Sequence, residues 1–309
     1  MSSCEVDYSG DVTTTASTAL PAYDGAELVV PAPGAGPGNW AGAASAVLAD
    51  GVYWLTWRNR RPLAEGRGVT VDVARSTDGV RFEVVAEVSR DIVGCESLER
   101  PVLVPVPQQQ GGGWRLFLSC ATWDSKHWWV DSLTAPTPEE LPGGRRQVVL
   151  PGDDEMAVKD PVVTVGADGT WEMWLTCHPL TDPGHEDRMT TRRLTSPDGL
   201  EWTDHGVVLR GRPGEWDERG ARVTTKIGNG LFLYDGRADA ASNWYETTGL
   251  ARWDGAGLVA DPGVAPISSP HSDGAFRYAS AVTLPDGRLR YYVEAARPDG
   301  AHDLITVVR

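Results

Sequence analysis

A short aromatic and aliphatic segment recurs five times along this 309-residue chain, about every 60 residues. The five copies are residues 52–57, 114–120, 171–177, 231–234 and 289–294. Runs of this length, rich in Trp, Tyr, Leu and Val and separated by turn residues, are typical of β-strands. A repeat of this period built from short strands predicts an all-β fold, a five-bladed β-propeller of four-stranded antiparallel blades around a central channel.

The third repeat shows the underlying hairpin most clearly. Residues 158–165 form an apolar run opened by Asp160-Pro161, the turn Asp168-Gly169 follows, and residues 171–177 return as an aromatic-rich strand. The aromatic side chains suit the faces on which neighbouring blades pack. The hairpin therefore predicts the first two strands of every blade.

A second turn motif predicts how the third strand of a blade joins its outer strand. Residues 76–82 and 196–202 both read Ser-x-Asp-Gly-x-x-aromatic, with Phe82 and Trp202 as the aromatic residues. In such a turn the glycine adopts positive φ, the aspartate caps the backbone and the ring packs beneath. The Asp-box of sialidases has a residue between its Asp and Gly, so this motif disfavours a sialidase.

The repeat fills nearly the whole chain, which predicts a single domain over residues 26–309. Residues 1–25 are polar and without period, and we expect a flexible arm there. The last blade has only three evident strands, so we expect the strand-like stretch Glu27–Ala32 to complete it and to remove an exposed edge.

Composition restricts the partners of the protein. The formal net charge is −15, which disfavours nucleic acids and anionic membranes because both are bound through lysine and arginine. No long apolar run and no basic, apolar leader are present, so we expect a cytoplasmic protein with no membrane partner. The four cysteines, Cys4, Cys95, Cys120 and Cys177, are expected to be thiols rather than disulfides.

Polar residues at the starts of the first strands are the candidates for a binding site. In a propeller these starts converge near one mouth of the channel, and acids and arginines gathered there favour a polar ligand pocket. Two carboxylates across such a pocket can split an acetal, one as acid and one as base or nucleophile. The candidate catalytic acids are Asp160, Glu99, Glu218 and its neighbour Asp217.

These motifs resemble those of propeller glycoside hydrolases. Lys-Asp-Pro-Val-Val at 159–163, the two Ser-x-Asp-Gly turns and Trp-Asp-x-x-Gly-Ala at 216–221 look like the grouping of families 43, 32, 68, 62 and 130, over residues 27–309. The resemblance implies an aspartate base or nucleophile in blade one, a pKa-tuning aspartate in an Asp-Pro element and a glutamate acid from a later blade. Asp160-Pro161 matches the Asp-Pro element.

The other two catalytic positions of that grouping are matched poorly. Glu99 and the pair Asp217-Glu218 are ambiguous counterparts, and Ala43 stands where the blade-one acid is expected. Either the carboxylates are redistributed, or the site binds sugar without cleaving it. A third alternative is a biosynthetic enzyme that uses the propeller pocket for another polar metabolite.

Further residues are candidates for holding a small carbohydrate, the expected partner. Arg100, Arg222 and Arg277 either neutralise the nearby acids or clamp an anionic sugar or phosphate. Trp40 is the best candidate for stacking on a sugar ring, ahead of Trp123, Trp128 and Trp129. Six histidines show no metal-binding spacing, and we expect neither metal nor cofactor. The remaining candidates are Asn39, Lys159, Tyr278, His178 and His271.

Overall fold

The computed structural model describes residues 20–228 and 230–309. Their strands form three four-stranded antiparallel sheets and one eight-stranded sheet, which divides into two four-stranded blades at a single bridge between β2 and β20. Blade I contains β2 (Trp40–Ala49), β3 (Val52–Arg60), β4 (Gly68–Ser76) and β5 (Glu83–Ser89). Blade II contains β6 (Leu98–Pro105), β7 (Trp114–Ala121), β8 (Trp128–Ala135) and β9 (Arg145–Leu150). Blade III contains β10 (Met156–Val165), β11 (Trp171–Pro179), β12 (Thr190–Ser196) and β13 (Thr203–Leu209). Blade IV contains β14 (Gly220–Gly228), β15 (Leu231–Arg237), β16 (Thr247–Trp253) and β17 (Leu258–Ala260). Blade V contains β18 (Phe276–Thr283), β19 (Leu289–Ala296), β20 (His302–Val308) and β1 (Glu27–Val30).

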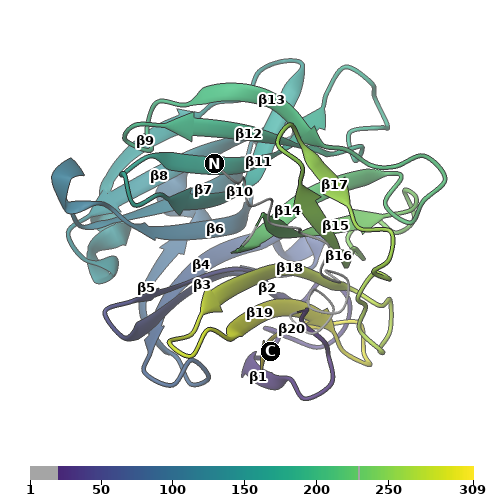
Figure 1. Ribbon diagram of the computed structural model, residues 1–309, viewed down its shortest axis with the longest axis horizontal. Helices are drawn as coiled ribbons and strands as arrows, with labels where there is room; N and C mark the ends of the chain where they lie inside the picture. Colours follow the sequence, from purple (N-terminus) through teal and green to yellow (C-terminus); the bar gives the residue numbers. More distant parts are fainter. Residues whose placement is uncertain (1–19, 229) are drawn as a thin grey trace, which may run out of the picture.

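The units are arranged around a centre as in a propeller, which confirms the predicted fold class (Figure 1). The strand β1 pairs with β20 and so supplies the fourth strand of blade V, as predicted for Glu27–Ala32. The C-terminal strand therefore lies beside a strand from the beginning of the chain, which covers one edge of the last blade. A single parallel bridge, Trp40 to His302, also joins blades I and V.

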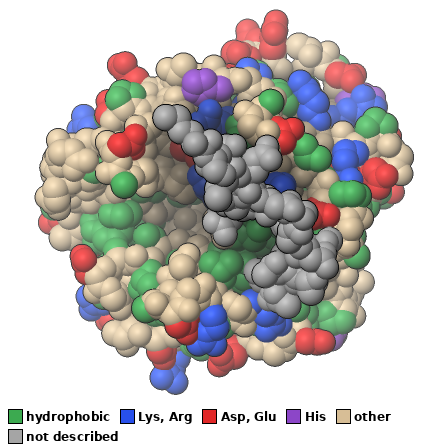
Figure 2. Space-filling model, viewed as in Figure 1, with side chains coloured by type: hydrophobic (Ala, Val, Ile, Leu, Met, Phe, Trp, Pro, Cys, Tyr) green, Lys and Arg blue, Asp and Glu red, His purple; other side chains and the backbone are tan. Residues whose placement is uncertain are grey.

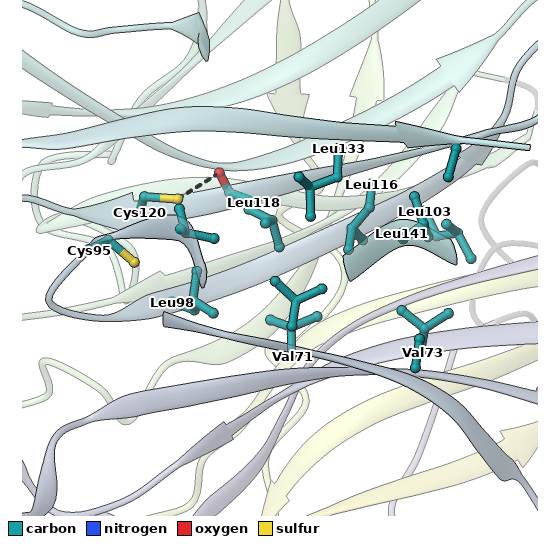
Figure 3. Close-up of a cluster of buried hydrophobic side chains, with 14 residues drawn as sticks. Val71, Val73, Cys95, Leu98, Leu103, Leu116, Leu118, Cys120, Leu133 and Leu141 are labelled. Atoms are coloured by element: carbon teal, nitrogen blue, oxygen red, sulfur yellow. Dashed lines mark hydrogen bonds between the residues drawn. The ribbon is translucent and has the colours of Figure 1, made fainter. Parts of the chain in front are cut away.

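Apolar side chains fill the space between neighbouring blades. Between blades I and II, Val71 and Val73 of β4 face Leu98 of β6 and Leu116 of β7 (Figure 3). All four are at most 3% exposed, together with Leu141 from the short 3₁₀ helix η3 (Pro138–Gly143). Burial of this apolar surface provides the main driving force for blade packing.

Each inner strand is interrupted by a β-bulge close to the channel mouth. Register shifts occur at residues 42–45, 98–101, 159–162, 223–225 and 277–280. Three bulge residues, Ala43, Asp160 and Tyr278, have φ near +50°. A bulge turns a side chain out of the regular alternation, and here it turns the side chains of Asp160 and Tyr278 into the interior, where they are 0% and 2% exposed.

The Ser-x-Asp-Gly turns have the predicted geometry. Ser76 Oγ accepts hydrogen bonds from the backbone N–H of Asp78 and Gly79, and Asp78 Oδ1 accepts from Val80 and Arg81. The same pattern recurs around Ser196 and Asp198. Gly79 and Gly199 both have φ of 73°, a value that favours glycine.

Residues 1–19 of the predicted arm, with Cys4, lie outside the described residues. In the described part of that segment, Leu20 is 9% exposed and packs in a cluster with Tyr23 and residues of blade V. Cys95, Cys120 and Cys177 are free, buried thiols. No helix in the described ranges is long and apolar enough to cross a membrane. One face of the molecule carries intermingled acidic and basic side chains (Figure 2).

Candidate functional site

A polar cavity of about 530 Å³ lies where the inner strands begin. All five blades and the connections between their strands contribute to its wall. Seven lysine and arginine side chains and four acidic ones line it among the described residues. The charged residues are Arg60, Arg67, Lys126, Lys159, Arg222, Arg237, Arg277, Glu99, Glu186, Asp187 and Glu246. The neutral wall residues used below are Trp40, Trp128, His178, Asn243, Trp244 and Tyr278.

Asp160 anchors a buried cluster directly behind this wall. Its Oδ2 accepts hydrogen bonds from Arg222 Nη1 at 3.1 Å and from the Tyr278 hydroxyl at 3.2 Å. Lys159 Nζ lies 3.5 Å from the same oxygen. Burial would raise the pKa of Asp160, but Lys159 and Arg222 outweigh burial and hold that pKa below its ordinary value. Asp160 therefore stays ionised and positions Arg222 and Tyr278.

Arg222 links this cluster to blade IV. Its Nη2 donates to Asp235 Oδ2 at 2.9 Å and lies 3.4 Å from Glu246 Oε1, and its guanidinium covers the Tyr278 ring at 3.8 Å. Burial raises the pKa of Asp235, against the opposing effect of Arg222. Because these acids surround it, the Arg222 guanidinium is fully compensated within the protein.

A second buried network joins blades IV, V and I. Arg277 donates to Glu246 Oε2 at 2.6 Å and to Glu294 Oε1 at 2.7 Å, and Arg58 donates to Glu294 Oε2 at 2.9 Å. Arg237 donates to Glu246 Oε1 at 2.8 Å. Burial would raise the pKa of both glutamates, but the arginines hold both below the ordinary range.

Glu294 also occupies the space where a blade-one acid would be needed. Its Oε2 accepts a hydrogen bond from the Ala43 backbone N–H at 3.0 Å, and its side chain lies tightly against Gly42. The corresponding bulge residue of blade IV is Thr224, which is 0% exposed. Neither blade therefore presents a carboxylate from its bulge.

Glu99 is the most deeply buried carboxylate on the cavity wall apart from Glu246, at 6% exposure. Its Oε2 lies 3.2 Å from Arg58 Nε. Burial would raise its pKa, but Arg58 and Lys159 together lower that pKa below the ordinary value. Glu99 therefore faces the cavity as an ionised carboxylate, suited to act as a base or nucleophile rather than as an acid.

Arg100 does not line the cavity, although the sequence predicted it as a ligand-binding residue. It is 2% exposed, and its Nη2 donates to the carbonyl oxygens of Ala44, Thr224 and Ala279 at 3.2, 2.6 and 3.4 Å. These carbonyls belong to the bulges of blades I, IV and V. Arg100 thus closes the channel below the cavity by satisfying backbone groups that the bulges leave unpaired.

Trp40 lines the cavity but does not offer a free face to a sugar. Its ring stacks on His302 at 4.6 Å and is covered by the Arg60 guanidinium at 4.0 Å, and the residue is 2% exposed. Trp244, in the connection between β15 and β16, is 39% exposed and lies on the cavity wall. Trp244 is therefore the aromatic side chain better placed to stack on a ligand.

His178 lines the cavity and is held as a neutral imidazole. Its Nδ1 donates to the Glu186 carbonyl oxygen at 2.7 Å, which leaves Nε2 as an acceptor. Burial, assisted by Lys159, lowers its pKa to about 3. His178 can therefore accept a hydrogen bond from a ligand hydroxyl at neutral pH.

Four predicted site residues lie elsewhere. Asp217 is 0% exposed and is held by Arg212 and Tyr234, and Glu218 is exposed and caps the N–H of Gly214. Asn39 donates to the Ala35 carbonyl oxygen and His271 packs edge-on against the ring of Tyr23. None of the four is among the described residues that line the cavity. The cavity wall does contain seven of the predicted residues, with Asp160 buried behind it: Lys159, Arg222, Arg277, Tyr278, His178, Trp40 and Glu99.

The sequence did not predict several residues of the cavity wall, because only the starts of the first strands were expected to converge on the site. The wall residues Arg60 of β3 and Arg237 of β15 lie on second strands, as do Arg58 and Glu294, which are buried and do not line the cavity. The second strand of a blade ends at the channel mouth, where its antiparallel partner, the first strand, begins. A charged residue at the end of the apolar second strand was therefore the sequence signal that could have identified these residues. Trp244, Glu246 and Asp187 lie in connections between strands, where the sequence carries no comparable signal.

The described residues contain no group of three His, Cys, Asp or Glu side chains arranged to hold a metal ion. The wall glutamates Glu99, Glu186 and Glu246 all have lowered pKa values. The cavity therefore offers ionised carboxylates, charged donors and a neutral imidazole, which suit recognition of a hydroxyl-rich ligand.

Comparison with solved structures shows the same fold in glycoside hydrolases. A thermostable family-43 glycoside hydrolase superimposes with a TM-score of 0.63 at 15% identity, covering 87% of this chain and 88% of that one. An endo-1,4-beta-xylanase from Bacteroides thetaiotaomicron gives 0.63 at 16% identity, covering 89% and 95%. The beta-1,2-mannobiose phosphorylase from Listeria innocua gives 0.56 at 16% identity, covering 93% and 92%. No family model and no curated protein sequence matches the chain.

The position of Arg100 leads to a stability prediction. In the Arg100→Met variant three buried carbonyl oxygens lose their donor, so we expect the free energy of unfolding to fall by at least ~3 kcal/mol. Urea titration measures this change. Arg288→Met, at an exposed arginine, is the control and should stay within about 0.5 kcal/mol of the wild type. If Arg100→Met lost as little stability as the control, Arg100 would not be needed to satisfy these carbonyl oxygens.

The neutral state of His178 predicts a pH dependence. Its folded pKa of about 3 lies below an unfolded value of about 6.5, so the unfolded chain binds the proton first as pH falls. Stability is therefore lost below pH ~6.5, and the urea midpoint of the wild type should fall more between pH 7.5 and 5 than that of His178→Gln. The exposed His205→Gln variant serves as control and should follow the wild type. Equal slopes for wild type and His178→Gln would refute the assignment.

Proposed function

We propose that this protein binds a small carbohydrate in the cavity and acts on its glycosidic bond, with Glu99 as the ionised carboxylate. The observation that carries this proposal is the position of Glu99, a 6% exposed carboxylate on the wall of a cavity of about 530 Å³. Cavities of roughly 300–1,000 Å³ are typical of small-molecule sites. The glycoside hydrolase-like fold supports the substrate class by analogy only, because one fold hosts many chemistries.

The chemistry of the wall is compatible with a sugar. Trp244 offers a partly exposed indole for stacking, and Asn243 and the Nε2 acceptor of His178 offer hydrogen-bond partners for hydroxyl groups. Glu99 would take the proton of a water molecule that attacks the anomeric carbon, or would attack that carbon itself. In both cases the bond from the anomeric carbon to the leaving oxygen breaks, and that oxygen would take its proton from solvent water. Asp160, buried behind Lys159 and Arg222, would position the cations around Glu99 rather than contact the substrate.

A second candidate function is sugar binding without cleavage. Splitting an acetal needs a carboxylic acid to protonate the leaving oxygen, and such an acid has a raised pKa. The glutamates on the wall all have lowered values, and Ala43 and Thr224 occupy bulge positions in blades I and IV. These observations argue against a conventional acid and base pair, and they are the specific support for this second candidate.

A matched pair of variants separates the two candidates. We expect Glu99→Gln to lower turnover by about a hundredfold, with ligand binding retained, because it removes the charge but keeps the shape. Glu218→Gln makes the same chemical change at an exposed residue away from the cavity and should leave turnover unchanged. The measurement combines calorimetric titration of a panel of small neutral glycosides with chromatographic assay of the products.

The outcomes of this experiment are distinct. Binding without turnover in the wild type establishes the second candidate. Turnover that survives Glu99→Gln removes Glu99 from the mechanism. If no glycoside in the panel binds, the carbohydrate proposal fails, and enzymatic action on another polar metabolite becomes the better hypothesis.

A further inference from the structure

We propose that the cavity binds an oxyanion, a carboxylate or phosphate group, beside the sugar, and that Arg60 and Lys159 are the residues that recognise it. This inference rests on the proposed function for the presence of a sugar, and it adds the charge of the ligand. It also separates the cations of the wall into those that the protein neutralises and those that it leaves for a ligand.

The charge of the wall runs against the charge of the protein. The chain has a net charge of −15, yet the wall carries seven lysines and arginines against four acids among the described residues. A wall of this kind attracts anions at short range, while the rest of the molecule does not. The net charge of the whole protein therefore does not describe the charge of the site itself.

The cations contributed by blades IV and V are already neutralised. Arg222, Arg237 and Arg277 each have a carboxylate oxygen within 3 Å, supplied by Glu246, Asp235 or Glu294. A buried ion pair of this kind has little attraction left for a further anion. These three arginines, two of which the sequence singled out for binding, are therefore mainly part of the scaffold.

Arg60 lies in the opposite situation. It is 3% exposed, and no described residue forms a salt bridge or a side-chain hydrogen bond with it. Its guanidinium is held by two indole rings, with Cζ 4.0 Å from the Trp40 ring centroid and 5.2 Å from that of Trp244. Burial lowers its pKa to about 10, although the negative charge of Glu99 opposes that shift, so Arg60 remains charged at neutral pH.

Lys159 is the second incompletely paired cation. Its Nζ lies 4.2 Å from the Trp128 ring centroid and 3.5 Å from Asp160 Oδ2, an oxygen that Arg222 and Tyr278 also share. Arg67 lies nearby on the same indole, at 5.3 Å, but its Nη1 lies 3.6 Å from Glu96 Oε1, so its charge is already paired. Lys159 also interacts electrostatically with Glu99, a carboxylate that it shares with Arg58.

The hydrogen-bond donors of Arg60 and Lys159 that lack a carboxylate partner of their own favour the binding of an anion. Burying a charge without a partner is costly, and charge-assisted hydrogen bonds to a carboxylate or phosphate are the strong way to offset that cost. The planar fork of Arg60, fixed between two indoles, is suited to two parallel bonds with such a group. The exposed Trp244 beside it would place a sugar ring next to the anion.

The test uses inorganic phosphate as probe on the full chain. We expect calorimetry to detect phosphate binding to the wild type and a loss of about tenfold, or ~1.4 kcal/mol, in Arg60→Gln and in Lys159→Gln. Arg288→Gln removes the same charge from an exposed hairpin outside the cavity and should bind phosphate like the wild type. Absence of phosphate binding in the wild type, or equal binding in all four proteins, overturns the proposal.

Circular dichroism and thermal unfolding check that each variant is folded. If Arg60→Gln does not fold, Arg60→Lys replaces it; this variant keeps the charge but loses the fork, so an intermediate affinity is expected. The Lys159→Gln variant provides an independent measurement, because Lys159 lies on a different blade and contacts a different indole.

Two sources of the oxyanion are distinguished by adding sugars. If the ligand carries the anion, glucuronate or glucose 6-phosphate should bind more tightly than glucose, and phosphate should compete with it. If the anion is free phosphate, it should instead tighten the binding of neutral glycosides. Neutral glycosides that bind while phosphate has no effect would overturn this inference and leave the proposed function standing. Phosphate binding that depends on Arg60, in the absence of any sugar binding, would support the oxyanion site and overturn the proposed function.

Discussion

Ion pairs that cross from one blade to the next are the interaction on which the centre of this propeller depends. Arg58 of blade I contacts Glu99 of blade II and Glu294 of blade V, and Asp160 of blade III contacts Arg222 of blade IV. Each group is almost fully buried, so each charge must have its partner in place. The blades are consequently fixed in register around the channel, and the apolar clusters between them can pack in one arrangement only.

The same pairing requirement shapes the site. Where the inner strands meet, Arg100 donates hydrogen bonds to carbonyl oxygens that the bulges leave unpaired and closes the channel below the cavity. Above it, blades IV and V satisfy their arginines internally, whereas on the other side Arg60 is held by two indole rings and Lys159 lies between an indole and a carboxylate oxygen of Asp160 that two other donors share. An aromatic ring keeps a cation in position without neutralising it, which leaves that cation available to a ligand.

The site also explains how far the analogy with glycoside hydrolases extends. The fold and the Asp-Pro element of blade III agree with it, but Asp160 is enclosed by three donors and lies behind the wall. Ala43 lies against the carboxylate of Glu294, and the acids at 217 and 218 serve a loop. Glu99 is therefore the centre of any chemistry on glycosides that we propose, and its ionised state depends on Arg58 and Lys159.

The sequence by itself determined the propeller, the strand that closes blade V, the Ser-x-Asp-Gly turns and most of the residues at the inner-strand starts. It did so because strand periodicity and turn chemistry are local properties that repeat with each blade. It could not decide which charges would be neutralised, because Arg100, Arg222 and Arg60 differ in the partners that the folded chain brings to them. Arg100 donates to Ala44 and Thr224, which are 56 and 124 positions away, whereas Asp235 is 13 positions from Arg222 on the neighbouring strand. These contacts depend on bulge geometry and strand pairing, so only the tertiary structure could separate the charges that hold the fold from those that face a ligand.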